Sequence, residues 1–253
     1  MNVDNRDRSS DFYGDRFQQV AKLPQSLSER DRHIPDLLAK MCKPGPFRLL
    51  DIGCGLGKVA RCAKDMFLDA SVYGLDISSK AIEKARSFRS DIDYRVCGEL
   101  DLPFDEGFFD YAACRMSIHH YPRILDHLRE VRRVLKPGGI YLIMDILPED
   151  AAQADRLNDV FLSADRDAPG DGHLRFRTLP EYEEVLRDAG FSLGDVLYSS
   201  FAVKWAKTTD YYRAICRHFE RMPREFQEQV RFTDHGENFV YCLRMGSLFA
   251  RQA

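Results

Sequence analysis

Alternate glycines after a short apolar segment are the part of this sequence best suited to bind a ligand. Residues 49–52 predict a buried strand, and Gly53, Gly55 and Gly57 follow it directly. Glycine leaves the backbone uncovered, so a ligand can lie against the N-terminus of the helix expected next. Asp51 stands two positions before the first glycine. These features predict a site for an adenine-bearing cofactor.

A second carboxylate ends the next apolar segment. Residues 71–75 predict a strand, and Asp76 follows it. A carboxylate at this point can accept both hydroxyls of a ribose, and each such hydrogen bond contributes about 1.5–3 kcal/mol. The same anchor would serve any adenosine ligand, NAD included. The alternative is that Asp76 caps the helix that begins near Ser78.

Two adjacent histidines are the candidates for catalysis. His119 and His120 follow the strand expected at 109–114, where doubly wound sheets open their ligand crevice. Imidazole groups titrate near neutral pH, so either ring is a candidate general base. The alternative is that one histidine packs under the cofactor and the other caps the next helix. Asp145 and His173 are weaker candidates for the same region, and no tight ligand spacing supports a metal site.

The elements that would position these residues alternate along the chain. Helices are expected at 57–68, 79–88, 122–135 and 179–189, between strands at 48–52, 71–75, 92–96, 109–114, 139–145, 192–201 and 238–249. We expect Lys136 in the last turn of the third of these helices, with Pro137 and Gly138 ending it. Strand and helix alternation predicts parallel crossovers and a doubly wound sheet.

Three segments interrupt the alternation within what we predict to be a single domain, 1–253. An N-terminal helical cap (1–44) has helices near 11–21 and 27–41, and 148–177 is an insertion of one helix and an irregular loop. A helical insertion (205–237) precedes the last strand segment (238–253), so the core is 45–147 and 178–204. Substrate contacts are expected from aromatic residues of these segments: Phe12, Tyr13, Phe17, those between Phe161 and Phe176, Trp205, Tyr211, Tyr212 and Phe219. The alternative is that these aromatics dock the helices onto the sheet.

The order of these motifs resembles a known family. Asp-x-Gly-x-Gly-x-Gly at 51–57 resembles motif I of the class I S-adenosylmethionine-dependent methyltransferases and differs from the dinucleotide pattern GxGxxG. Residues 97–110 and 131–145 resemble later landmarks of that family. Residues 114–122 resemble the branch that includes ubiquinone and menaquinone biosynthesis enzymes. They lack the Asn-Pro-Pro-Tyr signature of methyltransferases that act on DNA or glutamine amines.

The resemblance implies an α/β fold, a doubly wound Rossmann-like sheet of seven strands with the last one antiparallel, and S-adenosylmethionine as cofactor. It implies that Asp76 holds the ribose, that 53–57 contact the methionyl and sugar region, and that backbone near Arg115 holds the amino-acid end. Family members commonly carry Asp where this chain has Gly98, which leaves the adenine contact open between Glu99, Asp101 and the backbone of Leu100. The implied cofactor residues are Asp51, Gly53, Cys54, Gly55, Asp76, Ile77, Glu99, Leu100 and Arg115.

The expected activity is transfer of a methyl group from S-adenosylmethionine to an oxygen, carbon or nitrogen atom of a small apolar or aromatic molecule. Two alternatives stay open. One is an NAD-dependent oxidoreductase, which the glycine spacing disfavours. The other is a protein of this fold that binds the cofactor or a partner chain without catalysis.

The composition indicates which partners and which cellular compartment to expect. The 253 residues carry 37 basic and 40 acidic side chains, a formal charge of −3, so no global charge indicates nucleic-acid binding. No apolar run approaches the roughly 20 residues of a membrane span, and the polar N-terminus does not resemble a signal peptide. The 7 cysteines form no CxxC pair, which favours reduced thiols and a cytoplasmic protein. A homodimer is left open.

Overall fold

The computed structural model describes residues 31–170 and 172–253. The helix expected at 11–21 and the aromatic residues Phe12, Tyr13 and Phe17 lie outside the described residues. Of the helix expected at 27–41, the described part is α2 (Ile34–Met41), which begins later than predicted.

One mixed sheet forms the centre of the molecule. Its strands are β1 (Arg48–Ile52), β2 (Ser71–Asp76), β3 (Asp93–Val96), β4 (Phe109–Arg115), β5 (Leu135–Ile146), β6 (Phe191–Ala206) and β8 (Asn238–Gln252), in the order β3-β2-β1-β4-β5-β8-β6. The first five of this order run parallel, and β8 is antiparallel to both neighbours. The predicted seven-stranded doubly wound sheet is confirmed. One strand was not expected: β7 (Thr233–Asp234) pairs with β8 inside the segment predicted to be helical.

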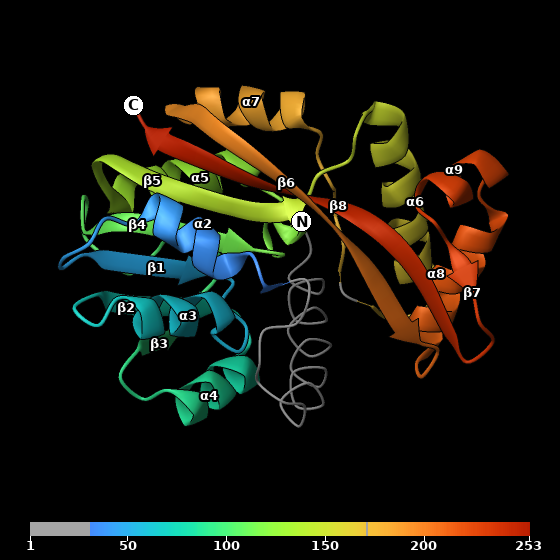
Figure 1. The fold of residues 1–253 in the computed structure, drawn as a ribbon, viewed down its shortest axis with the longest axis horizontal. Helices are drawn as coiled ribbons and strands as arrows, with labels where there is room; N and C mark the ends of the chain where they lie inside the picture. The colour runs from blue at the N-terminus through green and yellow to red at the C-terminus, as the bar shows by residue number, and fades with distance from the viewer. Residues whose placement is uncertain (1–30, 171) are drawn as a thin grey trace.

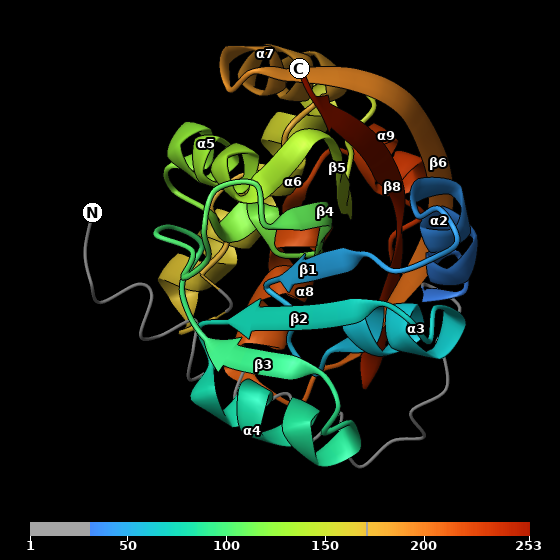
Figure 2. The ribbon, with the colours of Figure 1, turned by 90° about the vertical axis from the view of Figure 1, so that its left-hand side faces the viewer.

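Helices cover both faces of this sheet (Figure 2). Besides α2 they are α3 (Lys58–Met66), α4 (Ser79–Phe88), α5 (Ile124–Val134), α6 (Ala151–Asp167), α7 (Leu179–Asp188), α8 (Asp210–Arg221), α9 (Arg224–Gln229) and the short 3-10 helix η2 (Ile118–His120). Side chains alternate between the faces of a strand. In β1, Leu49 accordingly packs with α2 and α3, whereas Leu50 packs with α5.

The turn between α5 and β5 differs from the prediction. Helix α5 ends at Val134, and the chain is already paired as β5 from Leu135, so Lys136 is not in the last turn of the helix. Lys136 instead donates to Asp110 Oδ1 at 2.6 Å. The pairing of β4 with β5 shifts between Phe109 and Tyr111, and this irregularity lets the strand absorb residues 136–139.

Two strands leave the sheet and carry a separate helical lobe (Figure 1). β5 pairs with β8 only as far as Met245, while β6 stays paired with β8 to Asn238. Helices α6, α8 and α9 and strand β7 gather at this far end of the ribbon. Buried aromatic side chains form the core of the lobe: Phe161, Tyr211, Phe219, Phe226, Phe239 and Tyr241.

The lobe core corrects part of the predicted substrate surface. Tyr211 is 2% exposed and Phe219 is fully buried, so both dock helix α8 and neither is placed to reach a substrate. Trp205 and Tyr212 stack on each other with centroids 4.7 Å apart and are partly buried. Within the described residues no helix has the length and apolar character needed to cross a membrane.

Candidate active site at the carboxyl edge of the sheet

Four parallel strands end at one edge of the sheet, and each brings a polar group there. β1 brings Asp51, β2 brings Asp76, β4 brings Arg115 and β5 brings Asp145. The carboxyl edge of a parallel sheet is where doubly wound folds bind ligands. The sequence predicted these residues separately, and the fold brings them to the same edge.

The glycine turn after β1 fits tightly between neighbouring elements. Gly53, Gly55 and Gly57 all have positive φ, at 65°, 52° and 72°. A Cβ atom on Gly53 would overlap the Ser117 side chain, and one on Gly57 would overlap the Tyr94 hydroxyl. Cys54, which lies within the turn, is buried. The turn therefore requires glycine for conformation and for space.

Asp51 is buried with one carboxylate oxygen unused. Its Oδ2 accepts a hydrogen bond from the backbone N–H of Ala60 at 3.0 Å. Oδ1 is also buried, and among the described residues it has no hydrogen-bond partner. Burial raises the pKa of Asp51 to about 7, with the nearby charge of Asp76 adding to the shift. A cationic ligand group at Oδ1 would satisfy this atom.

Asp76 joins the glycine turn to the second strand. Its Oδ2 accepts from the backbone N–H of Gly55 at 2.8 Å, and its Oδ1 accepts from that of Ser78 at 2.9 Å. The residue that caps α4 is Ser78, whose hydroxyl accepts from Ala81, so the alternative that Asp76 is the cap is wrong. Burial raises the pKa of Asp76. Each carboxylate oxygen has two lone pairs, which leaves one on each for a ligand.

The loop after β3 carries the two acidic candidates for the adenine contact, and they differ in burial. Glu99 is 7% exposed, and its carbonyl accepts from His127 Nδ1 at 2.8 Å. Asp101 is exposed, with φ 56°, and Leu100 between them is partly buried. Ile77, which follows β2, keeps 38% of its surface exposed. Glu99 is thus the inward acid, and Ile77 offers an apolar surface at the same edge.

Arg115 belongs to a buried ion cluster that the sequence analysis missed. The Arg115 Nη2 and Lys58 Nζ atoms both donate to the carboxylate of Asp31, which is fully buried. Burial lowers the pKa of Arg115, while the charges of Asp31 and Asp51 oppose that shift. Asp31 lies 84 positions before Arg115, and no spacing in the sequence marks the contact.

His119 and Asp145 form a hydrogen-bonded pair. His119 Nδ1 lies 2.7 Å and 2.9 Å from the two oxygens of Asp145, and the side chains are 5% and 1% exposed. The backbone N–H groups of His119 and Ile146 also donate to Asp145. A carboxylate only accepts, so Nδ1 carries a proton, and in a neutral imidazole Nε2 then presents the lone pair. Among the described residues, no group hydrogen-bonds to Nε2.

Backbone strain accompanies this placement of His119. Met116, between β4 and η2, has φ 51°, an uncommon conformation for a residue other than glycine. Its N–H donates to the Met144 carbonyl at 2.8 Å, which continues the pairing of β4 with β5 by one residue. Strained residues of this kind concentrate at functional sites.

Other rings surround His119. The ring centroids of His120, Phe176 and His173 lie 4.0, 5.0 and 5.6 Å from that of His119. Burial lowers the pKa of His173 well below its usual value, so this ring is neutral. The N-cap of α5 is Arg123, so the alternative that one of the paired histidines caps that helix is wrong.

The loop after α6 is hydrogen-bonded to the backbone of His119. The backbone N–H groups of Leu174 and Arg175 donate to the His119 carbonyl at 3.2 and 3.1 Å. Asn158 on α6 accepts from the Phe176 N–H at 2.7 Å and donates to its carbonyl at 3.1 Å. Phe176 was expected as one of the aromatic substrate contacts, whereas nothing in the sequence singled out Asn158. Together these contacts tie the predicted insertion at 148–177 to the candidate base.

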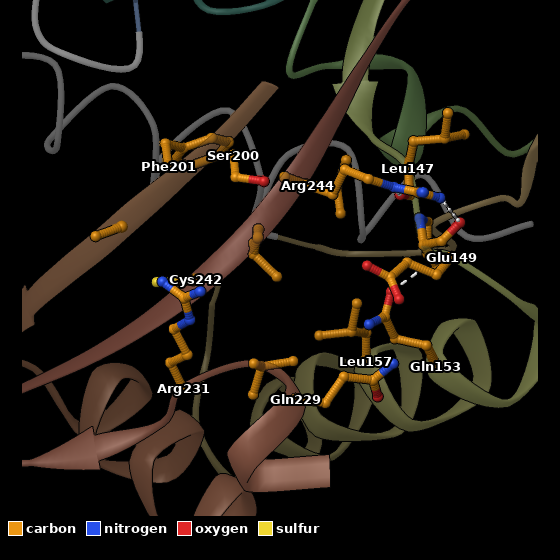
Figure 3. A pocket seen from close by; sticks show the side chains of 15 residues that line it. Leu147, Glu149, Gln153, Leu157, Ser200, Phe201, Gln229, Arg231, Cys242 and Arg244 are labelled. Carbon is orange, nitrogen blue, oxygen red and sulfur yellow. Dashed lines mark hydrogen bonds between the residues drawn. The ribbon is translucent and has the colours of Figure 1, made fainter. Parts of the chain in front are cut away.

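Two further features lie outside this site. A cavity of about 340 Å³ sits where β8 leaves β5, lined among others by Leu147, Gln153, Arg231 and Arg244 (Figure 3). It contains neither histidine of the pair nor Asp145. In the lobe, Cys216, Glu220 and Asp234 could together hold a metal ion, but Lys207 already lies 2.7 Å from Asp234 and supplies a cation there.

Comparisons with known proteins agree with this geometry. Residues 50–143 match a family described as a methyltransferase domain. The chain is 36% identical over 179 residues to 27-O-demethylrifamycin SV methyltransferase from Amycolatopsis mediterranei, covering 65% of this chain and 61% of that protein. It is 30% identical over 168 residues to a ubiquinone/menaquinone biosynthesis C-methyltransferase from Nitrobacter hamburgensis, covering 58% and 66%. The chain thus spans less than two thirds of the length of these curated relatives.

The fold also matches a solved structure. A putative methyltransferase from Bacillus halodurans superposes with a TM-score of 0.73 at 22% identity, covering 87% of this chain and 98% of that one. At this identity the likeness shows the fold alone.

Proposed function

We propose that the chain is a class I S-adenosylmethionine-dependent methyltransferase, which transfers a methyl group from S-adenosylmethionine to a small organic molecule. The observation that carries the proposal is the pair of carboxylates on either side of the glycine turn, the buried Asp51 and the partly buried Asp76. The named relatives are a 27-O-demethylrifamycin SV methyltransferase and a ubiquinone/menaquinone biosynthesis C-methyltransferase, which supports a small apolar or aromatic acceptor.

The residues at the sheet edge fit this cofactor. S-adenosylmethionine carries a sulfonium and an ammonium, and the unused Oδ1 of Asp51 is suited to such a cation. The two free lone pairs of Asp76 suit the ribose hydroxyls. Ile77 and Leu100 offer apolar surface to adenine, with Glu99 beside them. The turn at Gly53, Cys54 and Gly55 and the backbone near Arg115 would hold the rest.

When bound, the cofactor supplies an activated methyl group, so the protein mainly needs to position the acceptor and exclude water. We assign the role of general base to His119, because its Nδ1 is held by Asp145 while Nε2 presents a lone pair. His120 lines the same site, with Nδ1 3.3 Å from the Gly172 carbonyl. The accepting atom is an oxygen, carbon or nitrogen atom of that molecule.

We also propose a reducing, cytoplasmic setting without a nucleic-acid partner. All 7 cysteines are free thiols, as expected where disulfides are not maintained. The formal charge of −3 gives no electrostatic attraction to phosphate backbones.

The test is calorimetric and catalytic. The purified chain should bind S-adenosylmethionine and S-adenosylhomocysteine but not NAD, and it should convert the first to the second when given ring-bearing small molecules. Binding of NAD alone would establish the oxidoreductase instead. Cofactor binding without turnover on any acceptor, and with His119 replaceable, would establish a non-catalytic binding protein.

A further inference from the structure

The cavity where β8 leaves β5 has the features of a ligand site apart from the sheet edge. We propose that it binds an organic anion, whose charged group lies at Arg231 and Arg244 and whose apolar body lies against the remaining walls. Its volume of about 340 Å³ is within the range of small-molecule sites. This second site is separate from the proposed methyl-transfer site, and its occupancy does not depend on the proposed function.

The cavity forms because β8 changes partner along one edge. β5 pairs with β8 only from Met245 onward, whereas β7 pairs with it at residues 239–240. Between these two pairings, residues 242–244 of β8 line the cavity. Residues 146–149 at the end of β5, helix α6 and residues 229–231 at the end of α9 supply other walls (Figure 3). An occupant would therefore contact both the core and the lobe.

Positive charge exceeds negative charge on the walls. Among the described residues that line the cavity, Arg231 and Arg244 are the cations and Glu149 is the acid. Arg244 donates through Nε and Nη2 to the carbonyls of Leu147 and Pro148, and its Nη1 has no partner in the described part of the chain. The guanidinium of Arg231 has no hydrogen bond or ion pair with any described residue. A guanidinium group binds a carboxylate or sulfonate through parallel N–H donors.

Gln153 adds a buried donor to the same walls. The residue is 7% exposed, and its Oε1 accepts from the Glu149 N–H at 2.8 Å. Its Nε2 has no acceptor among the described residues. Because a buried polar group is costly when it stays unpaired, an oxygen atom of a ligand in the cavity would be stabilised there.

Arg231 occupies a backbone position that usually belongs to glycine. It lies two positions after the last residue of α9, with φ 49°. Its N–H donates to the Glu228 carbonyl at 3.1 Å, and the Phe232 N–H donates to the Gln227 carbonyl at 2.8 Å. This is the Schellman motif, whose left-handed residue is most often glycine because a Cβ is strained there. A strained arginine at a cavity wall indicates a role for its side chain.

Buried apolar side chains make up much of the remaining lining. They are Leu147, Leu157, Phe201, Val230 and Leu243. Such walls favour a ligand with an apolar body and disfavour a hydrated inorganic ion, which would lose its water without replacement. Charge and walls together therefore select an organic anion.

The experiment uses two fluorescent probes that differ by one charged group. 8-Anilinonaphthalene-1-sulfonate is an organic anion, and N-phenyl-1-naphthylamine has the same rings without the sulfonate. The full chain should bind the anion at least about tenfold more tightly than the neutral probe. Inorganic phosphate should not displace the anion, and S-adenosylhomocysteine should change its affinity by less than about twofold, as for separate sites.

Variants of Arg231 test the role of its guanidinium. Arg231→Gln should weaken binding of the anion about tenfold and leave that of the neutral probe within about twofold. Arg221→Gln is the matched control, because Arg221 is an exposed arginine at the end of α8 and does not line the cavity. Arg231→Gly should lose the anion equally but raise the midpoint of urea unfolding, since glycine relieves the strained φ. Loss of binding in a more stable variant cannot result from misfolding.

Amide hydrogen exchange locates the bound probe. The anion should slow exchange in residues 146–149 and 229–231 and leave the glycine turn, 53–57, unchanged. Four results overturn the inference: equal affinity for the two probes, unchanged affinity for the anion in both Arg231 variants, displacement of the anion by phosphate or S-adenosylhomocysteine, and slowed exchange confined to other residues. Failure to bind S-adenosylhomocysteine with the anion site intact overturns the proposed function alone.

Discussion

Buried carboxylates dominate the chemistry of this molecule at the scale of single residues. Asp31, Asp51 and Asp145 are each at most 1% exposed. Among the described residues, Lys58 and Arg115 donate to Asp31 and three N–H groups donate to Asp145, whereas Asp51 accepts only from the Ala60 N–H, on one oxygen. An uncompensated buried carboxylate is costly. Asp51 is therefore the residue whose state should change most when a cationic ligand arrives.

The first prediction concerns pH. The pKa of Asp51 in the ligand-free fold is raised to about 7, above its ordinary value of 3.8, by burial. This group therefore contributes stability that is present below pH 4 or so and is lost as the pH rises through about 7. A cation at Oδ1 favours the ionised form, so binding should release a proton below pH 7. Calorimetry at pH 6 in two buffers of different ionisation enthalpy should detect release of close to one proton.

The matched variant is Asp51→Asn. Its side chain cannot ionise, so binding should release no proton. The affinity of the native protein for S-adenosylmethionine should rise between pH 5 and 7, and that of the variant should not. If native protein and variant release the same number of protons, Asp51 does not face the cation.

The second prediction concerns Asp76. Asp76→Ala should weaken S-adenosylmethionine binding by about one to two decades, since each lost charged hydrogen bond is worth roughly 1.5–3 kcal/mol. Calorimetry measures this directly. Asp93→Ala is the control, because Asp93 is the first residue of β3, at the end of the strand away from the carboxyl edge, and forms an ion pair with Arg95. Unchanged affinity in Asp76→Ala would remove the ribose assignment.

At the scale of elements, the glycine turn is fixed by its neighbours as well as by its own φ values. Gly57→Ala would force a Cβ into the Tyr94 ring, whereas Gly138 has nearly the same φ with open space around it. We expect Gly138→Ala to cost about 1–2 kcal/mol from the left-handed backbone alone. Gly57→Ala should cost about 1–3 kcal/mol more from overpacking.

Urea unfolding of the two variants gives the comparison. Adding Tyr94→Phe to Gly57→Ala should recover part of the loss, because the Tyr94 hydroxyl is buried without a partner among the described residues and would overlap the new Cβ. Equal losses in Gly57→Ala and Gly138→Ala would mean that packing against Tyr94 contributes nothing.

The sequence predicted correctly those helix and strand boundaries that are set by neighbouring residues, such as a helix cap. Helix α7 begins at Leu179, after the N-cap residue Thr178, which forms a capping box with Glu181. The start of β5 was predicted too late, because pairing with β4 extends the strand through glycines that suggest a turn. Long-range partners leave no such signal: Asp31 with Arg115, and Asn158 with Phe176. The site's residue types were predictable, and these supports were not.

At the scale of the whole molecule, one ribbon joins the parallel core to the helical lobe. β6 and β8 run on together after β5 has turned away, and the cavity of Figure 3 lies in the fork. Arg244 on β8 bridges the fork to the residues that follow β5. Its Nε donates to the Leu147 carbonyl at 2.9 Å and its Nη2 to the Pro148 carbonyl at 2.8 Å, while the Leu147 N–H donates back to the Arg244 carbonyl.

This arrangement predicts that Arg244 couples the lobe to the core. Arg244→Ala removes two charge-assisted hydrogen bonds, and we expect a loss of about 1–3 kcal/mol concentrated on the lobe side of the fork. Amide hydrogen exchange should therefore accelerate in α8, α9 and residues 238–244 and stay unchanged in β1, β2 and β4. Arg251→Ala is the control, since Arg251 lies on the same strand but bonds Gly138 inside the core. Acceleration spread evenly over both parts would mean that they open as one unit.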